Sequence, residues 1–546
     1  GRCSTRGRIA MRQRSCTSVI VAVAIGLAAS AAAQDGHAPG TSLAAQPGAA
    51  ASPSRLEADL EALVAHALRL NLQLEGERMT PEIARTAVDA ARAGFEPTVQ
   101  FSPGFAIGSE TIQTAAGPLT SSTSAFSYAN GLSGALPYSS LAVGGALPTG
   151  TRYSVAFDLA RRSESPVRRQ DHGVETDSQL TVSFAQPLLR GAGTSIARAE
   201  IRAAGLSVRA AARRFSRLEE ETVAAVERAY WALAQAEAAE AVERESLERA
   251  VALHTRNEQL VRLGLVAEVD LLTAQQAVAA RQAAVTEAAR LRRDAAEELI
   301  FRVYGREAPD RLAMAEQIGV RALIVPPAVP PLEQAEAEAL SRRPDLIAAR
   351  EDVAVGGIRV EVARSDLKPS LQLTGSYTAA VTDAARLRIW GTDRVGDVAL
   401  TGWQGGLVLT VPVGNGLGKA GYRQATLERS RQEAAVAALE NDIRLQVRQA
   451  GRAIVEGTRR LAQTEAALDL ARRQYDAENR RLALGLTDSF RLLQVEQVVA
   501  DASRAVTEAR YAVASAVSDY HLAIGGNVDR YAGAGASPNH PRGRDE

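Results

Sequence analysis

Apolar residues recur every seven positions along two long stretches of this sequence. In the later stretch the repeat passes through Val447, Ile454, Leu461, Leu468, Tyr475 and Leu482. The positions between them are mostly small, and include Ala450, Gly457 and Ala471. A seven-residue apolar repeat predicts a coiled-coil seam, and small residues in it allow close backbone approach. In the earlier stretch the matching positions keep the same phase with two polar interruptions, at Val226, Leu233, Glu240, Leu247, His254 and Val261.

Each repeat predicts a very long helix that is followed by a glycine. The helices are expected over about 196–262 and 418–483, and each should span about 100 Å at 1.5 Å per residue. Gly264 in "LVRLGLVAEVDLL" and Gly485 in "RRLALGLTDSFRLL" follow them. Glycine inside a helix costs about 1 kcal/mol relative to alanine, but it tolerates the positive φ of a turn. We therefore expect the chain to reverse at both glycines, with return helices over about 268–304 and 488–523.

Shorter helices and candidate strands precede each long helix. The helices are expected over about 57–93 and 333–366. In the strand candidates, apolar and polar residues alternate or apolar residues follow one another, and Gly or Pro residues bound each segment. The candidates cover 98–107, 179–187, 370–379 and 403–412. A Gly/Ser/Thr-rich stretch over about 109–150, with a further strand candidate at 151–160, is interpreted as an extended loop or an additional hairpin.

The same order of elements occurs twice, which predicts a duplication. "EPTVQ" (96–100) resembles "KPSLQ" (368–372), and "FAQPLLRGAG" (184–193) resembles "LTVPVGNGLG" (409–418). We expect a first repeat over 57–306 and a second over 333–526. The Pro-rich linker 307–332 joins them and contains "VPPAVPP".

The beginning of the sequence is typical of an export signal. Met11 is followed by Arg12 and Arg14, an apolar run over 19–29 and small residues. This predicts a signal peptide over 11–33 that is cleaved after Ala33, with a retained anchor as the alternative. Residues 34–56 and the tail 527–546 are expected to be disordered.

Composition narrows the function classes. Hydrophobic residues make up 46% of the chain but aromatic residues only 4%, which favours long packed helices over a thick globular core. Lys+Arg and Asp+Glu both number 63, so there is no basic excess for nucleic acid. The only cysteines, Cys3 and Cys16, precede the predicted cleavage point. The six histidines show no ligand spacing, and no catalytic constellation is present, so neither a metal, a cofactor nor an enzyme is predicted.

One motif resembles a nucleotide-binding loop, but its position in the sequence favours a structural role. "GLGKAG" (416–421) has the G-x-G-x-x-G spacing that cradles a pyrophosphate in dinucleotide-binding folds. Here the following helix runs on for tens of residues, without a second parallel strand or an acidic residue near 20 positions later. The motif is interpreted as a turn that opens the helix.

The strand candidates raise a question of closure. They reach the roughly 9–11 residues that a membrane strand needs. Four strands cannot close a barrel, and lipid does not tolerate an open sheet edge. If these strands lie in a bilayer, several copies of the chain must combine them.

At this point the sequence resembles the TolC-like outer membrane efflux proteins over about 57–526. The motifs that carry the resemblance are "QPLLRG" (186–191), "RLGLVAEVDLLTAQ" (262–275), "RRPDLIAARE" (342–351), "LKPSLQLTGSY" (367–377) and "LALGLTDSFRLL" (482–493). Each is weak alone, whereas their order, duplication and spacing together are specific.

The resemblance implies a mainly α fold with membrane β-structure. In it, a homotrimer builds a 12-stranded outer-membrane β-barrel from four strands per chain, and long coiled-coil hairpins cross the periplasm. It further implies a passive exit duct of a tripartite efflux or type I secretion system, for small molecules or polypeptides. The implied partners are outer-membrane lipid, a periplasmic adaptor protein and an inner-membrane pump. No cofactor is implied.

The resemblance also assigns roles to residues near the two glycines. The tips that dock adaptor hairpins would be formed by Leu263, Gly264, Leu265, Val266, Ala267, Leu484, Gly485, Leu486 and Thr487. The pore gate would involve Asp270, Arg491 and Gln494. Some family members carry acidic residues at the positions of Arg491 and Gln494, so strong cation selectivity is not carried over to this chain.

Two alternatives stay open at this stage. The glycine turns could be plain hairpin turns without a docking partner. The whole chain could be a periplasmic coiled-coil adaptor or scaffold, although an adaptor usually has one hairpin and this sequence predicts two. A requirement for detergent extraction would distinguish a barrel protein from a soluble scaffold.

Overall fold

The computed structural model describes residues 56–104, 107–110, 113–114, 117–118, 123–126, 138–163, 174–320, 330–383 and 398–534. The predicted signal peptide 11–33 and nearly all of the segment 34–56 lie outside the described residues. Helices make up most of what is described, as the sequence predicts.

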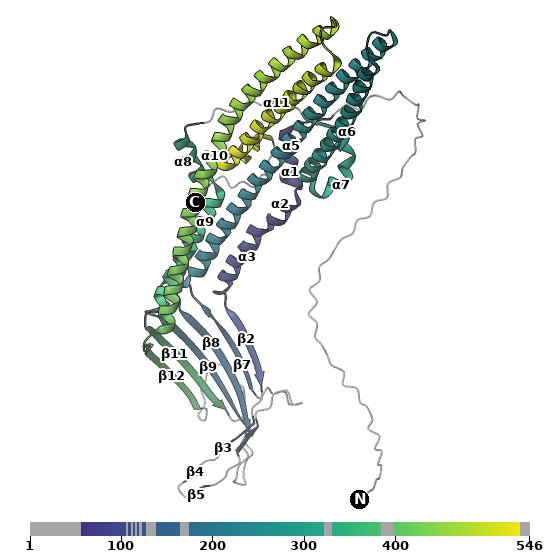
Figure 1. The fold of residues 1–546 in the computed structure, drawn as a ribbon. Coiled ribbons are helices and arrows are strands. Elements are labelled where there is room, and N and C mark those ends of the chain that lie inside the picture. Colours follow the sequence, from purple (N-terminus) through teal and green to yellow (C-terminus); the bar gives the residue numbers. More distant parts are fainter. Residues whose placement is uncertain are drawn as a thin grey trace, which may run out of the picture. The chain divides into compact units, whose positions relative to one another are not determined.

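Two long helices and their return helices dominate the fold (Figure 1). Helix α5, Ala199–Arg262, has 64 residues and α10, Gly416–Ala483, has 68. At 1.5 Å per residue each is about 100 Å long. The return helices are α6, Glu268–Tyr304, and α11, Ser489–Ile524. These bounds confirm the predicted long helices and return helices to within a few residues.

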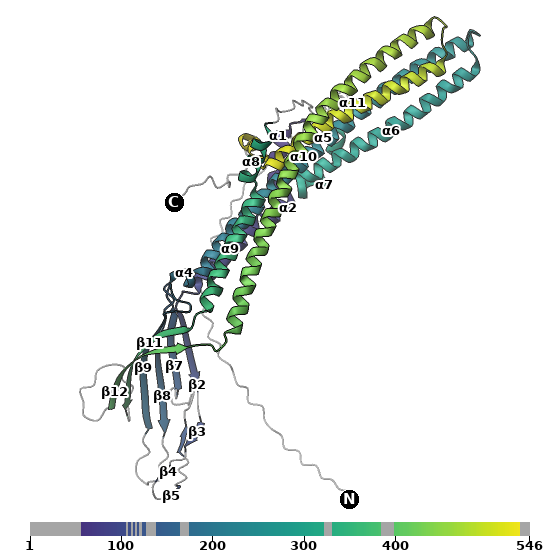
Figure 2. The same cartoon turned by 60° about the vertical axis from the view of Figure 1, so that its left-hand side comes forward.

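The helices pack side by side in a row (Figures 1 and 2). Near the sheet, α3 (Met79–Ala93) packs against α5, α5 against α9 (Pro344–Asp366), and α9 against α10. Toward the glycine turns, α6 packs against α5, α5 against α11, and α11 against α10. Helices α3 and α6 therefore stand at one end of the row and α10 at the other.

The predicted helix over 57–93 is wrong, because three helices occupy this segment: α1 (Leu60–Leu70), α2 (Leu72–Glu77) and α3. Asn71 causes the first break. Its side-chain oxygen accepts hydrogen bonds from the backbone N–H groups of Gln73 and Leu74, at 2.9 and 3.2 Å. Asparagine favours this capping geometry and so begins a new helix.

The predicted helix over 333–366 is likewise divided, into α8 (Leu332–Arg342) and α9. Pro344 begins α9, and a residue before proline is disfavoured in helical conformation, so Arg343 is extended. The Arg343 side chain is only 2% exposed. It donates to Asp345 at 2.5 and 3.1 Å and to Gln446 of α10 at 2.6 Å. These bonds fix the break against the long helix.

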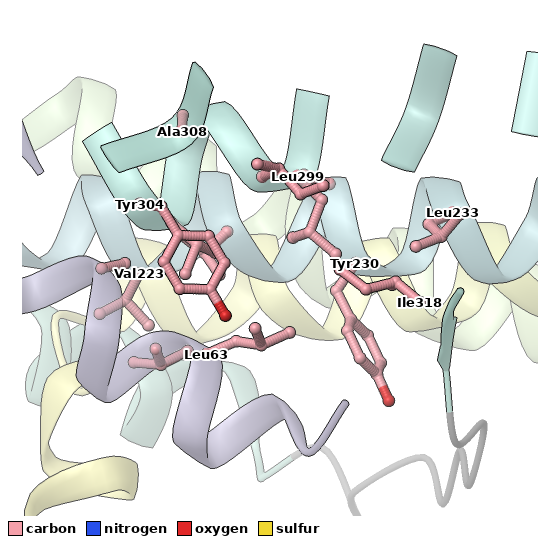
Figure 3. Close-up of a cluster of buried hydrophobic side chains, with 14 of the residues drawn as sticks. Leu63, Val223, Tyr230, Leu233, Leu299, Tyr304, Ala308 and Ile318 are labelled. Carbon is pink, nitrogen blue, oxygen red and sulfur yellow. The ribbon is translucent and has the colours of Figure 1, made fainter. Parts of the chain in front are cut away.

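The main apolar core lies where α1, α5 and α6 meet (Figure 3). Four short elements contribute side chains to it: α7 (Ala308–Arg311), η2 (Leu312–Glu316), β10 (Ile318–Val320) and η3 (Val528–Ala534). Two further short elements are β1 (Leu56–Ala58) and η1 (Gly305–Glu307). Strand β1 pairs in parallel with β10. A second core joins α8, α9, α10 and α11 around Leu346, Ile443 and Tyr520.

Two predicted irregular segments contribute to the first core. In the Pro-rich linker 307–332 only the "VPPAVPP" run (325–331) is predicted to be extended, and most of it lies outside the described residues, whereas Ala308, Ala315 and Ile318 earlier in the linker are buried. The tail 527–546 is predicted to be disordered, but in its described part, 527–534, Tyr531 is 5% exposed and donates to the Glu227 carboxylate at 2.5 Å. A few apolar side chains thus order segments whose overall composition is polar or Pro-rich.

A six-stranded antiparallel sheet adjoins the helices, with strand order β12-β11-β9-β8-β7-β2 (Figure 1). Its strands are β2 (Thr98–Gly104), β7 (Tyr138–Ala146), β8 (Arg152–Ser163), β9 (Val174–Pro187), β11 (Ser370–Asp383) and β12 (Val398–Thr410). Smaller elements are β3 (Ile107–Glu110) paired with β6 (Thr123–Phe126), β4 (Gln113–Thr114) paired with β5 (Gly117–Pro118), and α4 (Thr194–Ala197).

The predicted number of four strands per chain is wrong, because β7 and β8 are inserted in the sheet between β2 and β9. Of the two interpretations of the 109–160 region, the additional hairpin is correct for its second part. The sequence of β7, "YSSLAVGGA", is rich in small residues and therefore resembles a loop. Cross-strand pairing with β2 and β8 makes it a strand regardless.

The pairing register divides the sheet into an apolar and a polar face. Directly paired residues share a face and successive residues alternate. One row across all six strands consists of Val99, Val143, Val155, Val182, Tyr377 and Trp403. The neighbouring row on the opposite face consists of Thr98, Gly144, Ser154, Ser183, Ser376 and Gln404. The apolar face is exposed, whereas the polar face borders a hollow of about 360 Å³ lined in part by Ser154, Ser183, Thr374 and Gln404.

Among the described residues, no helix is both long and apolar enough to cross a bilayer.

Burial of Glu220 gives the helical region a pH dependence. Glu220 of α5 is 6% exposed, and its burial raises the pKa from 4.5 to about 7 despite Arg217 at 3.3 Å. Because Glu220 has a higher pKa in the folded protein than in the unfolded chain, its contribution to stability is fully present below pH 4.5. This contribution is lost as the pH rises through 7. We expect thermal unfolding followed by circular dichroism to show a larger loss of stability from pH 5 to pH 8 in the wild type than in Glu220→Gln, by on the order of 2–3 kcal/mol. Equal losses in the two proteins would contradict this assignment.

Candidate docking tips and gate

Two equivalent turns connect the long helices to their return helices. Gly264 has a φ of +70° and Gly485 a φ of +72°. Leu263 and Leu484 are the C-cap residues that directly follow α5 and α10. A left-handed residue directly after the helix end is the position that glycine occupies most readily.

The first turn is closed by two backbone hydrogen bonds. The N–H of Gly264 donates to the carbonyl of Val261, and the N–H of Leu265 donates to the carbonyl of Leu260, both at 2.9 Å. This pair of bonds defines a Schellman motif, which satisfies carbonyls left open at a helix end.

The second turn repeats this pattern. Gly485 donates to the carbonyl of Leu482 at 3.1 Å, and Leu486 donates to the carbonyl of Arg481 at 2.9 Å. Asp488 then caps α11, because its carboxylate accepts from the N–H of Arg491 at 2.7 Å. In the first turn Ala267 occupies the capping position, where no side chain can accept.

The turns display apolar side chains to solvent. Leu263 and Leu265 are 70% and 69% exposed, and Leu484 and Leu486 are 73% and 64% exposed. Ala267 is exposed and Val266 half-buried. The half-buried Thr487 instead donates to Glu478 at 2.6 Å and so braces the turn.

Two exposed apolar residues at the tips were missed by the sequence reasoning. Val269 is 69% exposed and Phe490 is 58% exposed. Each lies five residues after its glycine, so the equivalent spacing in the two halves is the signal that could have identified them.

Two of the predicted gate residues lie together. Arg491 and Gln494 are both exposed on α11, and an Arg491 guanidinium nitrogen donates to the Gln494 amide oxygen at 3.2 Å. Asp270 is half-buried on α6. Within the described parts of the chain, no hydrogen bond or ion pair joins the Asp270 carboxylate to either of them.

A buried asparagine connects the beginnings of both return helices. Asn257 of α5 is 1% exposed. Its amide nitrogen donates to the Asp270 carbonyl at 3.2 Å and to the Ser489 hydroxyl at 3.0 Å, and its amide oxygen accepts from that hydroxyl at 3.2 Å. Asn257 lies three residues after His254 on the predicted seam. A polar residue at such a position was the available signal.

A buried ionic cluster joins all four long helices about two turns beyond Ser489. At its centre Glu496 of α11 is 3% exposed. Its carboxylate accepts from the Ser246 hydroxyl of α5 and pairs with Arg281 of α6 at 2.9 Å. Arg249 of α5 approaches it at 3.8 Å and lies 5.8 Å from the Tyr475 ring of α10.

The Glu496 cluster is incompletely hydrogen-bonded. Two buried nitrogens of Arg249 have no hydrogen-bond partner in the part of the chain that the structure describes. A cavity of about 10 Å³, roughly the smallest that can hold one water, borders Arg249 and Glu496. The cluster therefore ties the two hairpins together by charge, while leaving polar groups that a rearrangement could satisfy.

Comparison with known families addresses the second half of the chain. Residues 337–526 match the family model described as outer membrane efflux protein. The second half of the chain is therefore similar to this family. The match confirms the resemblance drawn from the sequence motifs. The matched segment includes the second tip, Arg491, Gln494 and Glu496.

Solved structures share the fold over most of the chain. The outer-membrane channel OprN is 20% identical, with 87% of this chain and 94% of OprN covered and a TM-score of 0.62. The CmeC outer membrane channel of Campylobacter jejuni is 16% identical, with 86% of each chain covered and a TM-score of 0.61. The outer membrane protein VceC of Vibrio cholerae is 16% identical, with 85% of this chain and 96% of VceC covered and a TM-score of 0.59. No curated protein sequence matches the chain.

Proposed function

We propose that this protein is a passive exit duct in the outer membrane. It serves a tripartite efflux or type I secretion system and conducts small molecules or polypeptides. The observation that carries the proposal is the exposed apolar face of a sheet that adjoins two helical hairpins about 100 Å long. An exposed apolar face of this extent requires a partner, and strands that alternate between apolar and polar sides are typical of membrane barrels.

The row of helices supports closure by further copies. Helix α5 of the first half packs against α9 of the second half within one chain. Helix α10 is the counterpart of α5 in the second half, and α3 is the counterpart of α9 in the first. Packing of α10 against α3 of the next copy would repeat the α5–α9 contact. A head-to-tail contact of this kind closes a ring, and we propose a homotrimer whose helices extend into the periplasm.

The duct proposal is tested by reconstitution. Protein extracted by detergent from outer membranes is expected to form discrete conducting channels in planar lipid bilayers. Protein that fractionates with the aqueous periplasm and gives no channels would instead favour the alternative, a coiled-coil adaptor or scaffold. The proposal assigns no catalytic step and no cofactor to the chain.

We propose that the exposed leucines of the tips dock a periplasmic adaptor, which in turn contacts an inner-membrane pump. Replacement of Leu265 and Leu486 by Asp is expected to reduce co-purification of the cognate adaptor at least about tenfold, because two apolar anchors are lost. Leu291→Asp on α6 is the control, since Leu291 is 48% exposed and lies roughly 35 Å along the helix from its start. Adaptor recovery equal to wild type in the tip variant would show that the turns are structural only.

Arg491 is expected to weaken the cation preference of the duct. In a ring of copies its exposed guanidinium would recur around the constriction, and a charged ring sets the local field. Reversal potentials of single channels in a salt gradient should shift toward cation selectivity in Arg491→Asp. Strong cation selectivity in the wild type that Arg491→Asp does not change would contradict this role.

A further inference from the structure

Strands β7 and β8 have the same two faces as the rest of the sheet. On β8, Val155 and Phe157 lie in the apolar rows, between residues of β7 and β9. On β7, Leu141 and Val143 occupy the same rows. The intervening Ser154 and Ala156 lie on the polar face.

These strands are also long enough to cross a membrane. Strand β8 has 12 residues and pairs with β9 along its whole length, and β7 has nine residues. A membrane strand needs about 9–11 residues. If the β7–β8 hairpin lay outside a membrane-embedded sheet, its apolar face would be exposed to water, which is unfavourable.

The two ends of the sheet carry its most exposed apolar residues. Val99 on β2 is 68% exposed and Trp403 on β12 is 85% exposed, whereas Val155 and Val182 in the interior of the sheet are 38% and 40% exposed. Lipid does not tolerate an open strand edge. Strand β2 directly follows α3 and β12 directly precedes α10, so the open edges of the sheet continue the two ends of the helix row.

From these observations we propose that all six strands, with β7 and β8 among them, form the lipid-facing wall of the barrel. The β2 edge of one copy then pairs with the β12 edge of the next. The inference rests on the proposed function, and for a homotrimer it gives a barrel of eighteen strands instead of twelve. Barrel diameter grows roughly linearly with strand number. The membrane section is therefore wider than that of a twelve-stranded barrel.

Site-directed fluorescence quenching tests the proposal. Cys3 and Cys16 are replaced by serine, and one cysteine at a time is introduced by Val155→Cys, Ser154→Cys or Val182→Cys. Each is labelled with a polarity-sensitive fluorophore in proteoliposomes that contain lipids with brominated chains. Val155→Cys is expected to be quenched as strongly as Val182→Cys on β9, and severalfold more than Ser154→Cys.

The outcomes separate the inference from the function on which it rests. Quenching at Val182 with Val155 as weakly quenched as Ser154 would overturn the six-strand wall and leave the duct intact. Absence of quenching at both valines would overturn the wall and the duct together. Leu141→Cys with its neighbour Ser140→Cys on β7 provides a second pair if labelling at Val155 perturbs folding.

Discussion

Replacing Val182 by arginine is expected to remove most of the protein from the outer membrane, whereas replacing the adjacent Thr181 by arginine is expected to leave it there. Val182 lies in the apolar row near the middle of β9, and Thr181 faces the opposite side of the sheet. An arginine on the lipid face near the bilayer centre costs about 2–4 kcal/mol per strand, and lumen positions tolerate charge.

Every copy in a ring carries this cost. Because roughly 1.4 kcal/mol changes an equilibrium constant tenfold, we expect the membrane-inserted fraction to decrease at least tenfold. The measurement is the amount of each variant in outer-membrane fractions after density-gradient separation. Insertion of both variants at the wild-type level, or exclusion of Thr181→Arg alone, would contradict the assignment of the two faces.

Replacing Glu496 by alanine is expected to open the duct. The substitution removes the buried carboxylate that pairs with the half-buried Arg281 and lies near the half-buried Arg249, and breaking such a pair costs up to about 3–5 kcal/mol. Because Glu496 joins α11 to both α5 and α6, the two hairpins lose the charged connection nearest to their tips. We expect a higher open probability in single-channel recordings, with helix content by circular dichroism unchanged.

Glu508→Ala on the same helix is the matched control. Glu508 pairs with Arg460 at 3.3 Å, but both side chains are more than half exposed. Such surface pairs contribute about 0–1 kcal/mol, so Glu508→Ala channels should behave like wild type. If Glu496→Ala folds and conducts like wild type, the cluster does not hold the duct closed.

The long helices and the two turns could be predicted because their signals are local. A seven-residue apolar repeat fixes a helix over many turns, and Gly264 and Gly485 are required by a backbone conformation that other residues rarely adopt. The structure places both glycines where the sequence predicts them, directly after the C-cap residues of α5 and α10.

The strand number could not be predicted because small residues in β7 obscure the alternation. Only pairing with distant strands shows that Leu141 and Val143 share a face with Phe157 and Val182. Helix breaks were missed for a related reason. Asn71 begins a new helix through its side-chain hydrogen bonds, and Pro344 keeps Arg343 out of helical conformation, and the apolar period records neither break.

The candidate site likewise has one part that local sequence signals predict and one part that depends on distant contacts. Its tip leucines follow from the turn, whereas Glu496 and its partners lie on three helices that are far apart in sequence. A glutamate, two arginines and a serine among many charged helical residues carry no recognisable spacing. Their significance depends on burial, which only the packed structure provides.

Native mass spectrometry of protein extracted by detergent from outer membranes tests most directly that lipid-facing strands of several copies close one barrel. The account predicts a complex of three chains that requires detergent to leave the membrane. A single chain recovered from the aqueous fraction of the cell envelope would contradict it.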